Sequence, residues 1–147
     1  MRRASSGRFD LPLPAADAIC LFTPEGERAW SPGWSPQYGT GEPSETPGTV
    51  FTTAAHGTET IWVIVEISRS RSSATYARVT PGRHAGTVSV LCVDTRPGHS
   101  TVNVSYDMTL IGDRDSSGLD AYTPSQFEEM MRHWSEAIES YLYDQTG

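Results

Sequence analysis

The segment from Thr123 to Tyr143 repeats apolar residues at helical spacing, and this repeat constrains the fold more than any other feature. The apolar positions are Phe127, Met130, Met131, Trp134, Ile138, Tyr141 and Leu142. Residues spaced in this way lie on one face of a helix. Thr123-Pro124-Ser125-Gln126 is typical of a capping box with proline at the first helical position. The chain must therefore bury one face of a long C-terminal helix.

Five strand-like segments fill the middle of the chain, and short turn-forming segments join them. The strands are expected to begin near Thr49, Thr58, Ala74, Thr87 and Thr101. Pro81-Gly82 and Pro97-Gly98 favour tight type II turns, and tight turns connect antiparallel neighbours. The pattern predicts an antiparallel meander that can pack against the C-terminal helix.

The N-terminal part adds one more strand and two short helices. Gly7–Leu13 alternates in the manner of a strand, Pro14–Phe22 reads as a short helix, and a second helix starts at Thr23. Glu25 and Glu27 are placed where a helix N-terminus favours negative charge. We predict an α+β fold in which a curved antiparallel sheet of about six strands wraps around the long C-terminal helix. Residues 1–147 are expected to form one domain, with 1–6 disordered.

Alternation along the strands predicts which side chains face the core. Val102, Val104, Tyr106, Met108 and Leu110 share one face, and Val88, Val90 and Cys92 do the same one strand earlier. Between Ile61 and Ile67 both faces are apolar. Glu66 there favours Trp62 and Ile64 on the outer face, which places Ile61 and Val63 inside. Phe51, Trp62 and Ile64 would then form an outer apolar patch, and this patch makes a homodimer plausible.

Composition excludes several classes of function and location. The net charge is −7 and the chain contains no lysine, which rules out lysine Schiff-base chemistry and a lysine phosphate loop. An acidic surface disfavours nucleic acid. No apolar run is long enough to cross a bilayer, and no apolar core follows the basic first residues as a secretory signal would require. Cys20 and Cys92 are expected to be buried free thiols, so we expect a cytoplasmic protein.

The familiar catalytic motifs of hydrolases, zinc proteases and dinucleotide enzymes do not occur, and the sequence predicts neither a cofactor nor a metal. Asp113–Gly118 resembles half of a calcium loop, but Pro124 replaces the glutamate that such a loop needs.

His56 and Glu59 flank a predicted turn and could poise proton transfer, or form an exposed ion pair of little consequence. His84 and Tyr106 are the other weak candidates for proton carriers.

The order of elements and one stretch of sequence resemble a known superfamily. Leu21-Phe22-Thr23-Pro24-Glu25-Gly26-Glu27-Arg28, followed by Trp30-Ser31-Pro32-Gly33-Trp34, is similar to bacterial members of the START, polyketide cyclase and birch-pollen-allergen-like superfamily. The resemblance implies the helix-grip arrangement, with a deep cavity between sheet and last helix for lipids, sterols, polyketides or hormones. Some members catalyse cyclisation or dehydration, but no catalytic residue can be carried over from them.

The resemblance suggests binding or carriage of an apolar or amphipathic small molecule in that cavity. A polyketide cyclase- or dehydratase-like enzyme is the first alternative, and a protein-interaction module with a filled pocket is the second. The residues expected to contact the ligand are Trp30, Trp34, Ile61, Val63, Val90, Val104, Tyr106, Met108, Met130 and Trp134. Trp30 and Trp34 could instead plug the end of the domain as ordinary core.

Overall fold

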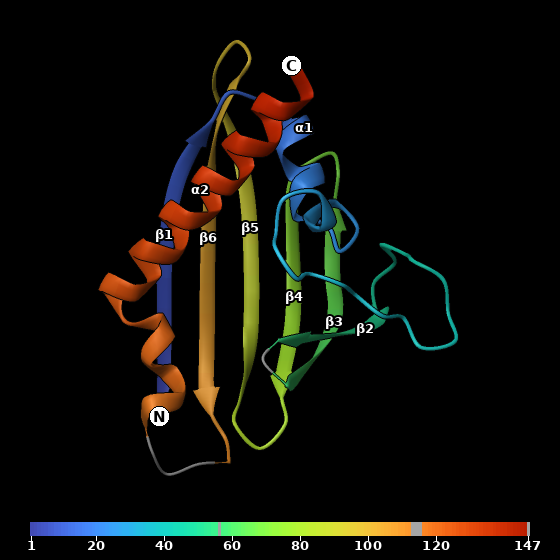
Figure 1. Cartoon of the computed structure of the whole chain (residues 1–147), viewed down its shortest axis with the longest axis vertical. Helices are drawn as coiled ribbons and strands as arrows, with labels where there is room; N and C mark the ends of the chain where they lie inside the picture. Colours follow the sequence, from blue (N-terminus) through green and yellow to red (C-terminus); the bar gives the residue numbers. More distant parts are fainter. Residues whose placement is uncertain (56, 113–115, 147) are drawn as a thin grey trace.

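A computed structural model describes residues 1–55, 57–112 and 116–146. In this part of the chain, six antiparallel strands form one sheet in the order β1-β6-β5-β4-β3-β2. The last five strands are sequential neighbours, and β1 lies at the edge beside β6. The helix α2, Pro124–Thr146, crosses the sheet over β1 and β6 (Figure 1). The predicted α+β fold, with a curved antiparallel sheet around a C-terminal helix, is confirmed.

The elements follow the predicted order closely. The strands are β1 Arg2–Leu11, β2 Val50–Ala55, β3 Thr58–Ser68, β4 Ser73–Thr80, β5 His84–Arg96 and β6 His99–Leu110. The helical segments are α1 Ala15–Ala18, η1 Ile19–Phe22, η2 Gly26–Ala29, η3 Ser116–Tyr122 and α2. The predicted short helices after the first strand are therefore present, and the first of them continues from an α-helical turn into a 3₁₀ turn.

The first strand begins at Arg2 instead of Gly7, so the expected disorder of residues 1–6 is wrong. Its Cα partners on β6 run from Arg2 opposite Thr109 to Leu11 opposite Ser100. Alanine and serine have weak strand propensity, so the sequence alone did not indicate a strand in this segment. Pairing with a complete neighbouring strand overrides that weak propensity. The strand ends at Leu11 because Pro12 has no N–H to donate.

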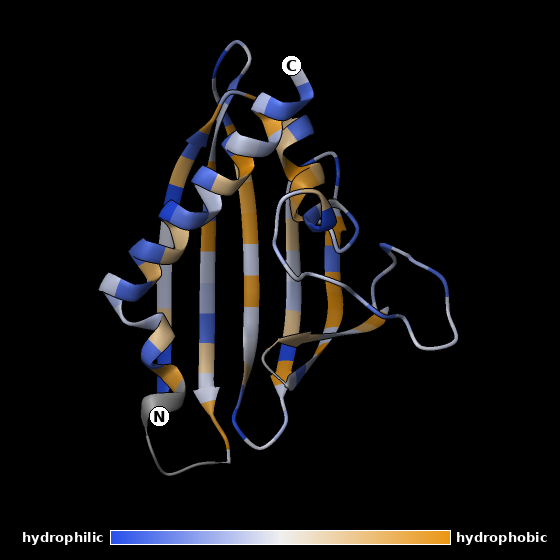
Figure 2. Cartoon of the chain, in the orientation of Figure 1, coloured by the Kyte–Doolittle hydropathy of each residue, from blue (hydrophilic) through white to orange (hydrophobic). Residues whose placement is uncertain are grey.

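The helix α2 packs on β1 through a glycine. A Cβ atom on Gly7 would lie 2.8 Å from Cγ of Met131, so only glycine leaves room for the helix at this distance. Phe127, Met131 and Ile138 are the buried residues of α2. Hydrophobic and hydrophilic residues alternate along the helix, as the periodicity of the sequence predicted (Figure 2). Thr123 accepts a hydrogen bond from the Gln126 N–H at 3.4 Å, as expected for its cap.

The predicted faces of β3 are inverted. Trp62 and Ile64 are 7% and 1% exposed and face the core, whereas Ile61 and Val63 are partly exposed on the other face. The cause is a bulge between Ile64 and Glu66 in the pairing with β4. A bulge adds one residue to a strand, so the outward direction of Glu66 no longer fixes the direction of Ile64.

The outer apolar patch expected from Phe51, Trp62 and Ile64 is therefore wrong. Phe51 is 1% exposed and packs with Trp62 in the core. The large apolar residues exposed on the strands are different ones: Val50, Val65, Val79, Leu91 and Val93. The predicted homodimer loses the surface on which it was based.

The two cysteines lie in different environments. Cys92 is buried as expected, and burial raises the pKa of its thiol to about 12. Cys20 is exposed, which corrects the prediction, and its Sγ lies 2.7 Å from an Nη atom of Arg69. Both thiols are free. Among the residues that the structure describes, no helix has the length and apolar character needed to cross a membrane.

Candidate functional site

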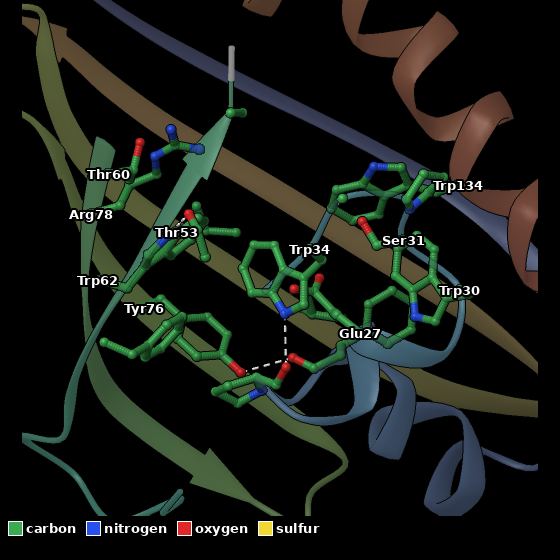
Figure 3. A pocket seen from close by; sticks show the side chains of 18 of the residues that line it. Glu27, Trp30, Ser31, Trp34, Thr53, Thr60, Trp62, Tyr76, Arg78 and Trp134 are labelled. Carbon is green, nitrogen blue, oxygen red and sulfur yellow. Dashed lines mark hydrogen bonds between the residues drawn. The ribbon is translucent and has the colours of Figure 1, made fainter. Parts of the chain in front are cut away.

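A cavity of about 600 Å³ lies between the sheet, the η1–η2 segment and α2. Strands β2 to β6 supply one wall, residues 22–34 supply a second, and Met130 and Trp134 of α2 supply a third. All four tryptophans of the chain line it: Trp30, Trp34, Trp62 and Trp134. Figure 3 shows these indoles arranged around the same space. Such a volume suits a small organic molecule.

Hydrogen bonds hold three of the indoles in place. The Nε1–H of Trp30 donates to the Leu21 carbonyl at 2.7 Å, and that of Trp34 donates to the Pro24 carbonyl at 2.8 Å. Trp62 donates to the hydroxyl of Thr53 at 3.0 Å. Because these polar N–H groups already have protein partners, the rings offer mainly apolar surface to the cavity.

Ring contacts group the aromatic side chains of the wall into two clusters. The ring centroids of Trp30 and Trp134 are 5.6 Å apart, and those of Trp34 and Trp62 are 5.5 Å apart, both in edge-to-face geometry. Phe51 is stacked on Trp62 at 5.8 Å. These distances are in the favourable range for aromatic pairs. These aromatic side chains are therefore held in fixed positions around the cavity.

Glu27 brings a carboxyl group into this apolar cavity. Its side chain extends from η2 into the space lined by the tryptophans (Figure 3). It forms no side-chain hydrogen bond or ion pair with the residues that the structure describes. Burial raises the pKa of Glu27 from its ordinary 4.5 to about 8, because low-dielectric surroundings disfavour the charged form. Glu27 is therefore mostly protonated at neutral pH.

Local sequence fixes the position of Glu27. A Cβ atom on Gly26 would lie 1.8 Å from the carbonyl oxygen of Cys20, so only glycine lets η2 approach the end of η1. Thr23 ties the two turns together, since its hydroxyl donates to the Cys20 carbonyl and accepts from the Gly26 N–H. Glu25, by contrast, is exposed and pairs with Arg28 at 2.9 Å.

Arg78 is the second ionisable group that sequence analysis missed. It lies on β4 with Trp62 as its Cα partner on β3, and its side chain lines the cavity. Two tyrosines, Tyr76 and Tyr106, complete the polar lining, and burial raises the pKa of both. Tyr76 donates to the Phe22 carbonyl at 2.7 Å. Two features of the sequence could have indicated these groups. Glu27 lies three residues before Trp30, and Arg78 lies two residues after the inward Tyr76 on the same face of its strand.

The structure places six of the ten predicted ligand contacts on the cavity wall. These are Trp30, Trp34, Val90, Tyr106, Met130 and Trp134. The prediction is wrong for Ile61 and Val63, because the bulge in β3 turns them to the outer face. Val104 and Met108 face inward but do not reach the cavity, since they are fully buried under other side chains.

The three predicted proton carriers that the structure describes, Glu59, His84 and Tyr106, do not form one group. Glu59 is exposed on the outer face, and its Cα partner is Ala54. His56 and residues 113–115 of the resembled calcium loop lie outside the described residues. His84 is buried against Tyr122, with 6.0 Å between ring centroids, and does not line the cavity. Within the described residues, no cluster of three potential ligands could hold a metal.

No family model and no curated protein matches the chain. Solved structures do match. Ginseng major latex-like protein 151 from Panax ginseng is 18% identical, with a TM-score of 0.69 over 96% of this chain and 97% of that one. A START superfamily protein from Mycobacterium smegmatis is 11% identical, with a TM-score of 0.66 over 97% and 98%. The chain has the helix-grip fold. This confirms the resemblance inferred from sequence at the level of fold.

A third helix-grip structure is an enzyme. Norcoclaurine synthase from Thalictrum flavum, in complex with dopamine and hydroxybenzaldehyde, is 9% identical, with a TM-score of 0.64 over 95% of this chain and 88% of that one. Identities this low show a shared helix-grip fold and nothing of a shared chemistry. The cavity described above lies between sheet and last helix, where the resemblance implied it.

Proposed function

We propose that this protein binds or carries an apolar or amphipathic small molecule in its internal cavity. The observation that supports the proposal is a partly open cavity of about 600 Å³ with four tryptophans on its walls. Protein interiors are close-packed, so a hollow of this size lined by apolar side chains favours a ligand-binding role over a packed core. The same volume weighs against the alternative of an interaction module with a filled pocket.

A second candidate, acid–base catalysis of the cyclase or dehydratase kind, is favoured by Glu27. A pKa of about 8 lets its carboxyl donate a proton at neutral pH, which ordinary carboxyl groups cannot do. The earlier candidates contribute little to this proposal, since Glu59 faces outward and His84 lies outside the lining. Tyr106 lines the cavity and could assist in orienting a substrate. Turnover of a bound ligand, which a carrier lacks, distinguishes this candidate.

Two cross-strand valines test whether the cavity is open. Val90 lines the cavity, while its partner Val104 does not, and they are 3% and 0% exposed. Val90→Phe should cost less than about 1 kcal/mol because the larger ring enters empty space, whereas Val104→Phe should cost about 1–3 kcal/mol by overpacking. Denaturant unfolding measures both. Equal losses of stability in the two variants would contradict an open cavity.

The cellular setting and assembly are also proposals. Free cysteines support a cytoplasmic location, and a disulfide between Cys20 and Cys92 in natively produced protein would contradict it. A homodimer would have to use the apolar residues of the outer sheet face, among them Val65 and Leu91. We propose one domain for the whole chain, with no part in binding nucleic acid.

A further inference from the structure

Arg78 occupies a position that strand periodicity reserves for the core. Its neighbours at alternate positions, Tyr76 and Thr80, are 6% and 3% exposed and face the concave side. The guanidinium carbon of Arg78 lies 4.7 Å from the centroid of the Trp62 ring. A cation at this distance over an indole is held by attraction to the ring. The guanidinium is thus held against the cavity wall, on a side chain that is partly buried.

No protein anion neutralises this charge among the described residues. The ion pairs found there belong to Arg2, Arg28, Arg69, Arg71, Arg132 and His133. All of their side chains are substantially exposed. The Nε atom of Arg78, in contrast, is buried without a hydrogen-bond partner. Leaving a buried N–H donor without a partner is costly, and an oxyanion that accepts from it would remove that cost.

The neighbouring titratable groups are neutral near pH 7. Burial raises the pKa values of Tyr76 and Tyr106, and it raises that of Glu27 to about 8. Burial, followed by the charges of Arg78 and Arg83, lowers the pKa of His84. Arg78 therefore carries the one full charge among the described residues that line the cavity. Figure 3 shows it on a separate part of the wall from Glu27.

We propose that the ligand is an amphipathic organic acid whose oxyanion, such as a carboxylate, pairs with Arg78 while its apolar body lies against the tryptophans. This inference rests on the proposed binding function and names its ligand class. The planar guanidinium presents several N–H donors in a fork that matches a carboxylate. The indole N–H groups of Trp30, Trp34 and Trp62 are already occupied. Arg78 is thus the anchor for the polar end of the ligand.

Three probes with one apolar body test the proposal at pH 7: 1-pyrenebutyrate, 1-pyrenebutanol and 1-pyrenebutylamine. We expect the anion to bind about tenfold or more tightly than the alcohol, since a charge-assisted hydrogen bond contributes about 1.5–3 kcal/mol. The amine should bind more weakly than the alcohol. Arg78→Met should reduce the affinity for 1-pyrenebutyrate to within about threefold of the affinity for 1-pyrenebutanol. The affinity for the alcohol should stay nearly unchanged. Fluorescence titration measures each affinity.

Matched variants make each outcome informative. Arg71→Met removes an arginine that is 69% exposed and pairs with Glu66, and it should leave the preference for the anion intact. Arg78→Lys should keep part of the preference because it keeps the charge, and it serves as a second variant if Arg78→Met does not fold. A preference for the anion that survives in Arg78→Met overturns the inference. The inference is also overturned if the wild type binds the alcohol and shows no preference for the anion. That result leaves the proposed function intact. Failure of all three probes to bind would count against the proposed function itself.

Discussion

Replacement of Glu27 by glutamine is expected to stabilise the protein at alkaline pH. The pKa of Glu27 is about 8 in the folded protein and close to its ordinary 4.5 in the unfolded chain. Between these two values the folded state holds a proton that the unfolded state releases. The free energy of unfolding therefore falls as pH rises, by up to about 1.4 kcal/mol per pH unit for this group. The amide has the shape of the protonated acid and does not ionise.

We expect the two proteins to have similar stability near pH 4.5 and the variant to be more stable by about 2–4 kcal/mol at pH 8.5. The difference should grow with pH through the window from 4.5 to 8 and level off above it. His84 has the opposite effect, since a lowered pKa makes stability rise with pH, but this contribution is common to both proteins. Urea unfolding at several pH values gives the difference directly. A constant difference across the window would show that Glu27 is not shielded from water.

Trp134→Ala is the second substitution with a large expected effect, on binding more than on stability. Trp134 contacts Trp30 and Phe22, with centroids 5.6 and 6.2 Å away, but another part of its ring faces the cavity. Truncation in a packed core costs about 3–5 kcal/mol for tryptophan. Because part of this ring is already unpacked, we expect a loss below about 2 kcal/mol. The affinity for 1-pyrenebutanol should change severalfold.

Ile138→Ala is the matched control on the same helix. Ile138 is 0% exposed and lies outside the cavity lining, so its truncation should cost about 2–5 kcal/mol. Probe affinity should stay close to that of the wild type. Denaturant unfolding and probe titration of both variants separate packing from binding. If Trp134→Ala cost more than about 3 kcal/mol and neither it nor the wild type bound the probe, Trp134 would be ordinary core.

The fold was predictable because its determinants are local. The helical period of Phe127 to Leu142, the cap at Thr123 and the glycine-containing turns each act over a few residues. The start of β1 was not predictable, because Arg2 to Ser6 are held by pairing with β6 and not by their own propensity. Tertiary context decides such segments.

The site was predictable only in part, and one residue explains much of the error. The bulge before Glu66 inverts the faces of β3, so Trp62 replaces Ile61 and Val63 on the cavity wall. Nothing in the alternation of apolar residues indicates an extra residue in a strand that is apolar on both faces. Glu27 and Arg78 were missed for another reason. A charged residue at an inward position conflicts with the rule that cores are apolar, and such conflicts mark functional sites.

The four tryptophans provide the most direct test of the central claim, that the cavity holds an apolar ligand. Every indole of the chain lines the cavity, so tryptophan emission reports on its contents. Pyrene accepts energy from indole, and 1-pyrenebutanol carries no charge that Arg78 could attract. Titration of the wild type with this probe should quench tryptophan emission and saturate at one probe per chain. Tryptophan emission that stays constant, or that falls in proportion to the probe without saturating, would contradict the account.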